Sequence, residues 1–160
     1  MIISDAKGNT LAFLARTGRQ QEGVERCERM IKEEPPHPRN YVLLASAYSK
    51  AGEEEKALCI LEDGLRQFPD HAILMSEAGD RCKALKKFDQ ALHYWEQSSA
   101  LDPEAIDTRY ATAFYLMEQG KNREAEKVWE QIIAWLLQRG FDVQSQWPMR
   151  ELEKLRQKTE

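Results

Sequence analysis

Three cysteines and three histidines are the side chains of this 160-residue sequence with the chemistry to bind a metal or to form cross-links. They are Cys27, Cys59, Cys82, His37, His71 and His93. The cysteines are odd in number, widely spaced and without a Cys-x-x-Cys pair, which argues against a disulfide framework and a structural zinc site. His37 and His71 stand 34 residues apart (71 − 37 = 34), and other residue types recur with the same step. Repetition therefore accounts for their spacing better than metal binding does, and we expect no metal site.

Sequence motifs that carry catalysis are missing. The chain contains no glycine-rich phosphate loop, no Gly-x-Ser-x-Gly turn and no His-Glu-x-x-His pair. Its 27 aspartates and glutamates follow the polar faces of the expected helices. We expect neither an enzyme nor a bound cofactor.

The distribution of charge argues against nucleic acid as a partner. The net charge is −4, and the 23 lysines and arginines are interleaved with glutamates, whereas nucleic-acid binders usually present a basic stripe. The longest apolar run, residues 132–137, is far shorter than the roughly 20 residues that cross a bilayer. The N-terminus shows no basic segment followed by an apolar stretch, so no signal peptide is expected. We expect a cytoplasmic protein that makes no membrane contact.

A step of 34 residues organises most of the chain. Pro35, Pro69 and Pro103 follow it (69 − 35 = 34 and 103 − 69 = 34). A second set with the same step consists of Gly18, Gly52, Lys86 and Gly120. Repetition at a fixed period predicts stacked repeats, each of which buries its apolar face against its neighbour.

Each repeat divides at its glycine or lysine into two segments of about 14 residues with apolar residues at helical spacing. In the second repeat Tyr41, Leu44 and Tyr48 mark such a stripe. Glycine at the division suits the left-handed residue that ends a helix, and Lys86 is expected to adopt the same backbone conformation. The large repeating side chains are expected to pack in the core; they include Tyr48, Cys82, Trp95 and Trp129.

These repeating residues resemble the tetratricopeptide repeat (TPR) family of helix–turn–helix units. The third repeat matches best, with Phe88, Ala91 and Trp95 at family positions. The resemblance implies an all-α fold, a right-handed TPR-type solenoid of antiparallel helix pairs with a C-terminal capping helix. We expect a single domain over residues 1–160, with repeats at about 4–37, 38–71, 72–105 and 106–139.

The resemblance also implies a binding face, because in TPR proteins the first helix of each repeat lines a concave surface that holds extended peptides. By register, the residues on that face are Arg39, Val42, Ser46, Ser49, Ser76, Asp80, Lys83, Tyr110, Phe114 and Met117. The last three recur at i, i+4 and i+7 on a face that the core stripe does not need. Two interpretations remain open for them: the C-terminal segment packs over them, or a partner's apolar side chain does.

The chain departs from the repeat after residue 139. Gly140 is expected to stop a long helix that begins near Asn122. Residues 141–160 are expected to hold a polar connector at 142–146 and a last helix at 149–158, with Pro148 suited to its first turn. This last helix would cap the apolar end of the stack, or else dock on a partner or on a second copy of the chain.

The implied function is a non-catalytic protein-interaction scaffold or adaptor that binds a peptide segment on its concave face. Two alternatives stay open: a chaperone-like TPR protein that holds an unfolded client, and a self-assembling TPR module. The expected partner is a protein or peptide, with no nucleic acid, membrane, metal or cofactor. A homo-oligomer could form through the first repeat, which has no cap before it, or through the C-terminal helix.

Overall fold

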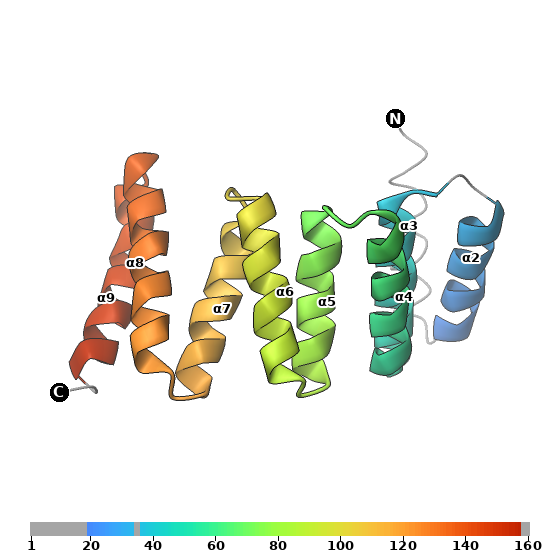
Figure 1. Cartoon of the computed structure of the whole chain (residues 1–160), viewed down its shortest axis with the longest axis horizontal. Coiled ribbons are helices and arrows are strands. Elements are labelled where there is room, and N and C mark those ends of the chain that lie inside the picture. Colours follow the sequence, from blue (N-terminus) through green and yellow to red (C-terminus); the bar gives the residue numbers. More distant parts are fainter. Residues whose placement is uncertain (1–18, 34–35, 158–160) are drawn as a thin grey trace. The chain divides into compact units, whose positions relative to one another are not determined.

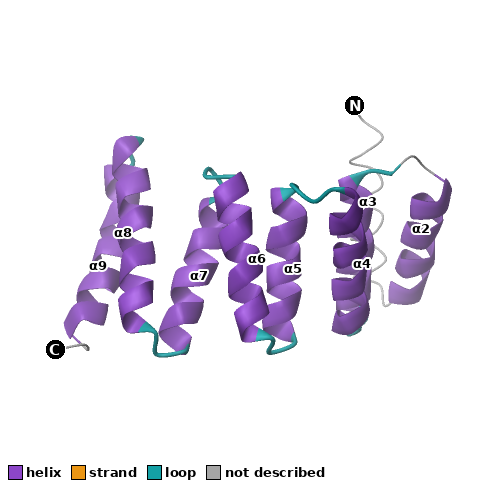
Figure 2. Cartoon of the chain, in the orientation of Figure 1, coloured by secondary structure: helices purple, strands orange, loops and turns teal. Residues whose placement is uncertain are grey.

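The computed structural model describes residues 19–33 and 36–157, which form eight α-helices and no strand (Figure 1). The helices are α2 (Gln20–Glu33), α3 (Pro38–Lys50), α4 (Glu54–Gln67), α5 (Ala72–Ala84), α6 (Phe88–Leu101), α7 (Ile106–Glu118), α8 (Asn122–Gln138) and α9 (Asp142–Gln157). Figure 2 shows that short loops join helices that follow one another in the chain. The all-α expectation is confirmed. Gly18 and Pro35, which the repeat pattern used, lie outside the described residues.

Contacts divide the chain into two compact units, Met1–Tyr94 and Trp95–Glu160, with the boundary inside α6. In the N-terminal unit, α2 packs on α3, α3 on α4 and α4 on α5, and α3 also packs on α5. In the C-terminal unit, α7 packs on α8 and α8 on α9. The single domain and the four repeat boundaries expected from the sequence remain predictions.

Each described first helix, α3, α5 and α7, is followed by one residue with left-handed backbone. The angle φ is 79° at Gly52, 59° at Lys86 and 69° at Gly120. The amide after each of these residues donates back across the turn, from Glu53 to the Tyr48 carbonyl (2.9 Å), from Lys87 to Cys82 (2.8 Å) and from Lys121 to Leu116 (2.9 Å). These bonds complete Schellman motifs, which satisfy carbonyls that the helix end leaves free. The left-handed conformation expected for Lys86 is confirmed.

Histidine side chains cap the start of two first helices. At α3, Nδ1 of His37 accepts a hydrogen bond from the amide of Arg39 (3.1 Å). At α5, Nδ1 of His71 accepts one from the amide of Leu74 (3.3 Å). Each imidazole nitrogen accepts a hydrogen bond from a free amide of the first turn, as a serine or aspartate oxygen usually does at an N-cap. The 34-residue spacing of these histidines therefore has a structural cause.

Small and large side chains recur together in the core. The fully buried residues at the repeating positions include Ala57, Ala91, Ala125, Cys82, Trp95 and Trp129. The alanines let helices approach closely while the tryptophans fill the space beside them. Tyr48 differs from the expectation because it is only partly buried: its hydroxyl donates to Oε1 of Glu28 (2.5 Å), and this bond raises the pKa of Tyr48 to about 12.

Gly64 lies inside α4, at a position where glycine destabilises a helix by about 1 kcal/mol relative to alanine. A Cβ atom at this residue would stand 2.9 Å from Cγ and 3.0 Å from Cβ of Tyr41. The missing side chain allows the Tyr41 ring of α3 to lie directly against the backbone of α4. The ring of Phe68 meets Tyr41 edge-on, with 6.3 Å between the ring centroids.

The C-terminal segment differs from the sequence-based expectation. No polar connector occupies residues 142–146, because α9 begins at Asp142, two residues after the left-handed Gly140. Pro148 therefore lies inside the helix, where it cannot donate a backbone hydrogen bond to the carbonyl of Gln144. The helix tolerates this loss because Pro148 is fully buried, and Leu152 and Leu155 further along it are buried as well.

Replacing Lys86 with glycine should leave stability unchanged or raise it by up to about 1 kcal/mol. Glycine removes the Cβ atom that is strained in left-handed backbone, which stabilises the folded state. Glycine also raises the conformational entropy of the unfolded chain, which partly offsets that gain in stability. Gly52→Val places a β-branched residue in the same conformation and should destabilise the protein by about 1–2 kcal/mol. Thermal melts compare the variants; equal losses from both substitutions would contradict the account of this turn.

Replacing Gly64 with alanine should destabilise the protein by about 1–2 kcal/mol, because overpacking against Tyr41 outweighs the gain in helix propensity. In a Tyr41→Ala background the ring contacts are gone and only the contact with the Cβ atom of residue 41 remains, so the same substitution should cost less stability. Urea unfolding of the four proteins in this cycle measures the difference. A Gly64→Ala protein that is more stable than the wild type would show that the close approach is not needed.

Candidate functional site

Seven of the ten residues expected on the binding face lie in the N-terminal unit, on two first helices that pack together. They are Arg39, Val42, Ser46 and Ser49 of α3, and Ser76, Asp80 and Lys83 of α5. Arg39 and Asp80 are exposed, and the other five are partly buried. Such a surface offers charges and hydroxyl groups but little apolar area, so it suits hydrogen bonding to an extended peptide more than hydrophobic burial.

Ser49 is held in a polar network that joins three helices. Its hydroxyl donates to Oε1 of Glu54 (2.8 Å) at the start of α4 and accepts from the Arg81 guanidinium of α5. Arg81 also contacts Oε2 of Glu54 at 3.4 Å, and both charged side chains are mostly buried. The network fixes the end of α3 against its neighbours, so Ser49 stabilises the surface and its hydroxyl proton is not free for a ligand.

One carboxyl group near this network has a raised pKa. Burial raises the pKa of Glu77 on α5; the nearby Arg81 guanidinium opposes the shift, and Asp80 adds to it. A partly buried carboxyl that is more easily protonated can donate as well as accept a hydrogen bond.

The other three expected residues, Tyr110, Phe114 and Met117, lie on α7 in the C-terminal unit and contact a group of aromatic rings. We call Tyr110, Phe114, Trp129 and Trp147 the aromatic cluster. Trp129 of α8 is fully buried, and its ring centroid lies 5.8 Å from that of Tyr110 and 5.4 Å from that of Phe114. Its indole Nε1 donates to the Met117 sulfur at 3.3 Å. Burial, and secondarily Asp107, raises the pKa of Tyr110.

Trp147 of α9 completes the aromatic cluster. Its ring centroid lies 5.8 Å from Tyr110, 5.7 Å from Phe114 and 5.5 Å from Trp129. The C-terminal segment therefore packs over these residues, as one of the two open interpretations held. It does so incompletely, because Phe114 remains 37% exposed and Trp147 45% exposed. We call these two exposed side chains the aromatic edge.

Sequence reasoning missed Trp147, Arg81 and Glu54 as parts of these surfaces. The sequence predicts a last helix over residues 149–158, so Trp147 falls just before it and its contacts do not follow from the helix pattern. The signal that could have found it is the i, i+8 spacing of Trp147 and Leu155 on one continuous helix, which Pro148 concealed.

Neither a metal site nor a membrane span belongs to these surfaces in the described part of the chain. Residues 19–33 and 36–157 contain no group of three or more cysteine, histidine or acidic side chains placed to hold a metal ion. Within the same residues, every helix is too short or too polar to cross a bilayer.

Known proteins with similar sequence and fold contain helical repeats. Residues 14–78 match the family model described as "Tetratricopeptide repeat". Tetratricopeptide repeat protein 21B of Mus musculus is 33% identical over 70 residues, which are 44% of this chain and only 5% of that protein. The chain thus spans a small part of this relative's length.

Two solved structures show the same fold. A tetratricopeptide repeat protein from Parabacteroides merdae superposes with a TM-score of 0.73 at 18% identity, covering 96% of this chain and 60% of that one. A thermophilic TPR protein in Thermus thermophilus gives 0.68 at 24% identity, covering 91% and 79%. At these identities the similarity concerns the fold alone.

Replacing Trp147 with alanine should destabilise the C-terminal unit by about 2–3 kcal/mol, because it removes a half-buried ring from three aromatic contacts. Val143→Ala is the matched control one turn earlier in α9: its side chain is 74% exposed, so the change should stay within about 0.5 kcal/mol. Urea unfolding followed by tryptophan fluorescence compares them. Equal stability of the two variants would mean that α9 does not hold the aromatic cluster.

Proposed function

We propose that this chain, a tetratricopeptide repeat protein, acts in the cytoplasm as a non-catalytic scaffold or adaptor that binds a peptide segment of a partner protein. The TPR fold generally mediates protein–protein interaction. The observation that carries the proposal is the aromatic edge, where Phe114 and Trp147 stay exposed beside the buried Trp129. Aromatic side chains of this kind dominate binding energy at protein interfaces.

The proposed mode of binding uses different chemistry in each unit. At the aromatic edge, an apolar side chain of the partner would cover Phe114 and Trp147 and remove their exposed ring area from water. In the N-terminal unit, polar residues of the first-helix face such as Ser46 and Lys83 would form a separate contact, with hydrogen bonds to the backbone of a bound segment. At the aromatic edge, burial of the exposed rings would supply most of the affinity.

A chaperone-like role is the second candidate, and it would use the same aromatic edge. An exposed apolar surface can hold many unfolded segments with low selectivity, whereas an adaptor binds one partner through a defined sequence. Capture from a lysate on the immobilised full chain separates the two: one dominant protein supports the adaptor, and many weakly held proteins support the chaperone. Self-assembly, the third candidate, would appear as a mass that rises with concentration in light scattering.

Replacing Phe114 with alanine should weaken binding of the captured partner by about 1–3 kcal/mol while most helicity is kept. Leu101→Ala is the control, since Leu101 is a similarly exposed apolar residue at the end of α6, outside the aromatic cluster. Calorimetric titration with the purified partner measures affinity, and circular dichroism checks the fold. If the folded Phe114→Ala protein binds the partner with unchanged affinity, Phe114 contributes to internal packing and not to binding.

A further inference from the structure

The start of α9, residues 142–147, is held against the C-terminal unit less firmly than the rest of that helix. Ser145 is the one buried residue among them, Val143 is mostly exposed, and Trp147 is about half exposed. The buried residues further along α9 are Pro148, Leu152 and Leu155. We call residues 142–147 the strap. The remainder of α9 is anchored by a burial of apolar side chains that the strap lacks.

Pro148 separates the strap from the anchored part of α9. Proline has no amide hydrogen, so Pro148 donates no helix hydrogen bond to the carbonyl of Gln144. The proline ring also crowds the backbone of the residue before it and disfavours helical backbone there, and that residue is Trp147. The helix loses a backbone hydrogen bond and holds Trp147 against its local preference at the same place, where the strap can therefore separate from the remainder of α9.

Two hydrogen bonds of the strap are local. The amide of Ser145 donates to the carbonyl of Phe141 (3.0 Å), and the hydroxyl of Ser145 donates to the carbonyl of Asp142 (2.7 Å). Both bonds keep the strap helical but join it to no other helix. Its aromatic attachment to α7 and α8 is the ring of Trp147, whose centroid lies 5.8, 5.7 and 5.5 Å from those of the other rings of the aromatic cluster.

The balance of these contacts favours a local opening of the strap. The half-exposed ring of Trp147 gains only part of the burial that a core tryptophan gains, and the missing backbone bond opposes that gain. Segments with few buried apolar contacts and exposed backbone hydrogen bonds open at a lower free energy than the whole domain unfolds. The strap meets both conditions, whereas the segment that contains Leu152 and Leu155 does not.

We propose that the strap opens from the aromatic cluster about Pro148 in the free chain, and that a bound partner closes it. The proposal rests on the proposed function, because the partner that closes the strap is the one that covers the aromatic edge. That edge is continuous only while Trp147 lies beside Phe114. A partner that contacts both rings binds the closed form alone, so its binding shifts the population towards that form.

Hydrogen–deuterium exchange of the free full chain, read at single amides by NMR in low concentrations of urea, tests the opening without a partner. After correction for intrinsic rates, the amides of residues 145–147 should exchange about tenfold faster than those of Leu152 and Leu155. Their exchange should depend little on urea, because a local opening exposes little surface.

Residues 125–127 of α8 are the matched control for ordinary fraying of a helix end. Like residues 145–147 of α9, they are the fourth to sixth residues of a helix that begins two residues after a left-handed glycine. They should show the slow, urea-dependent exchange of Leu152. A single degree of protection and a single urea dependence for all these amides would overturn the opening.

Pro148→Ala tests the position of the hinge, because alanine supplies an amide that can donate to the Gln144 carbonyl and removes the crowding at Trp147. Protection of residues 145–147 should rise about fivefold, although loss of the buried proline ring lowers the stability of the unit. Pro103→Ala is the control, since Pro103 is an exposed proline between α6 and α7, and it should leave exchange in the strap unchanged. No gain in protection in a folded Pro148→Ala protein would contradict the hinge.

The complex with the captured partner tests the closing. In the bound chain the strap amides should exchange as slowly as that of Leu152. Strap exchange that stays fast, while Phe114→Ala weakens the binding, would overturn the closing and leave the proposed function standing. Unchanged affinity of Phe114→Ala would overturn the proposed function and the closing with it, whereas the opening is decided by the free chain.

Discussion

The left-handed residue after each first helix is the constraint on which the rest of the structure depends. At Gly52, Lys86 and Gly120 the chain reverses direction over a few residues, and the amide that follows bonds back to the helix it has left. The second helix therefore begins at a fixed place in every described repeat. If the first helix ended one residue earlier or later, the next helix would be rotated by about 100° and its apolar stripe would face away from the core. The buried alanines and tryptophans can recur every 34 residues only because these turns are equivalent.

Features governed by local rules could be predicted from the sequence. The left-handed backbone of Lys86 follows from its place in the series of glycines, although the residue itself disfavours that conformation. The C-terminal helix could not be placed from such rules. Proline at the first turn is a frequent position, but burial of Pro148, Leu152 and Leu155 against the rest of the unit outweighs the backbone hydrogen bond that the proline loses.

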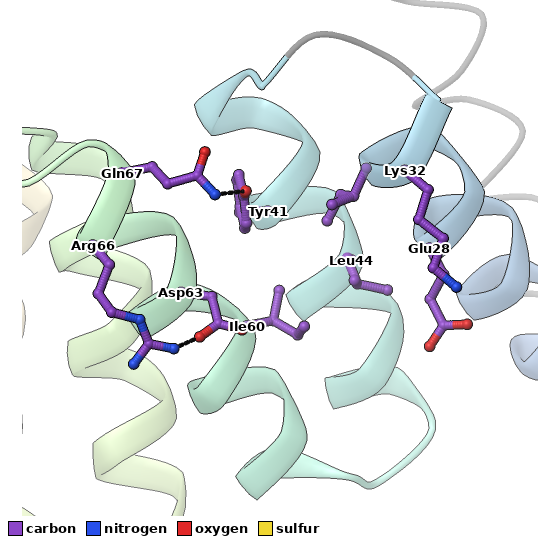
Figure 3. A pocket seen from close by; sticks show the side chains of 9 residues that line it. Glu28, Lys32, Tyr41, Leu44, Ile60, Asp63, Arg66 and Gln67 are labelled. Carbon is purple, nitrogen blue, oxygen red and sulfur yellow. Dashed lines mark hydrogen bonds and ion pairs between the residues drawn. The ribbon is translucent and has the colours of Figure 1, made fainter.

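Contacts between distant residues account for what was missed at the candidate surfaces. Periodicity places Ser49 and Phe114 on a helix face but does not say which other side chain covers that face. Ser49 is held by Arg81, 32 residues later, and Phe114 is covered in part by Trp147, 33 residues later (147 − 114 = 33). Both partners act across tertiary contacts. The same reason explains why a pocket lined by residues of three helices, α2, α3 and α4, leaves no pattern in the sequence (Figure 3).

The central claim is that the aromatic edge of the C-terminal unit binds a protein partner. Hydrogen–deuterium exchange of the full chain, free and bound to the partner it captures, tests this claim most directly, because amide protection reports which helices the partner covers or stabilises. The account predicts slower exchange in α7 and around Trp147 of α9 in the complex than in the free chain. Amide exchange rates in α7 and α9 that are the same in the free and the bound chain would contradict the account.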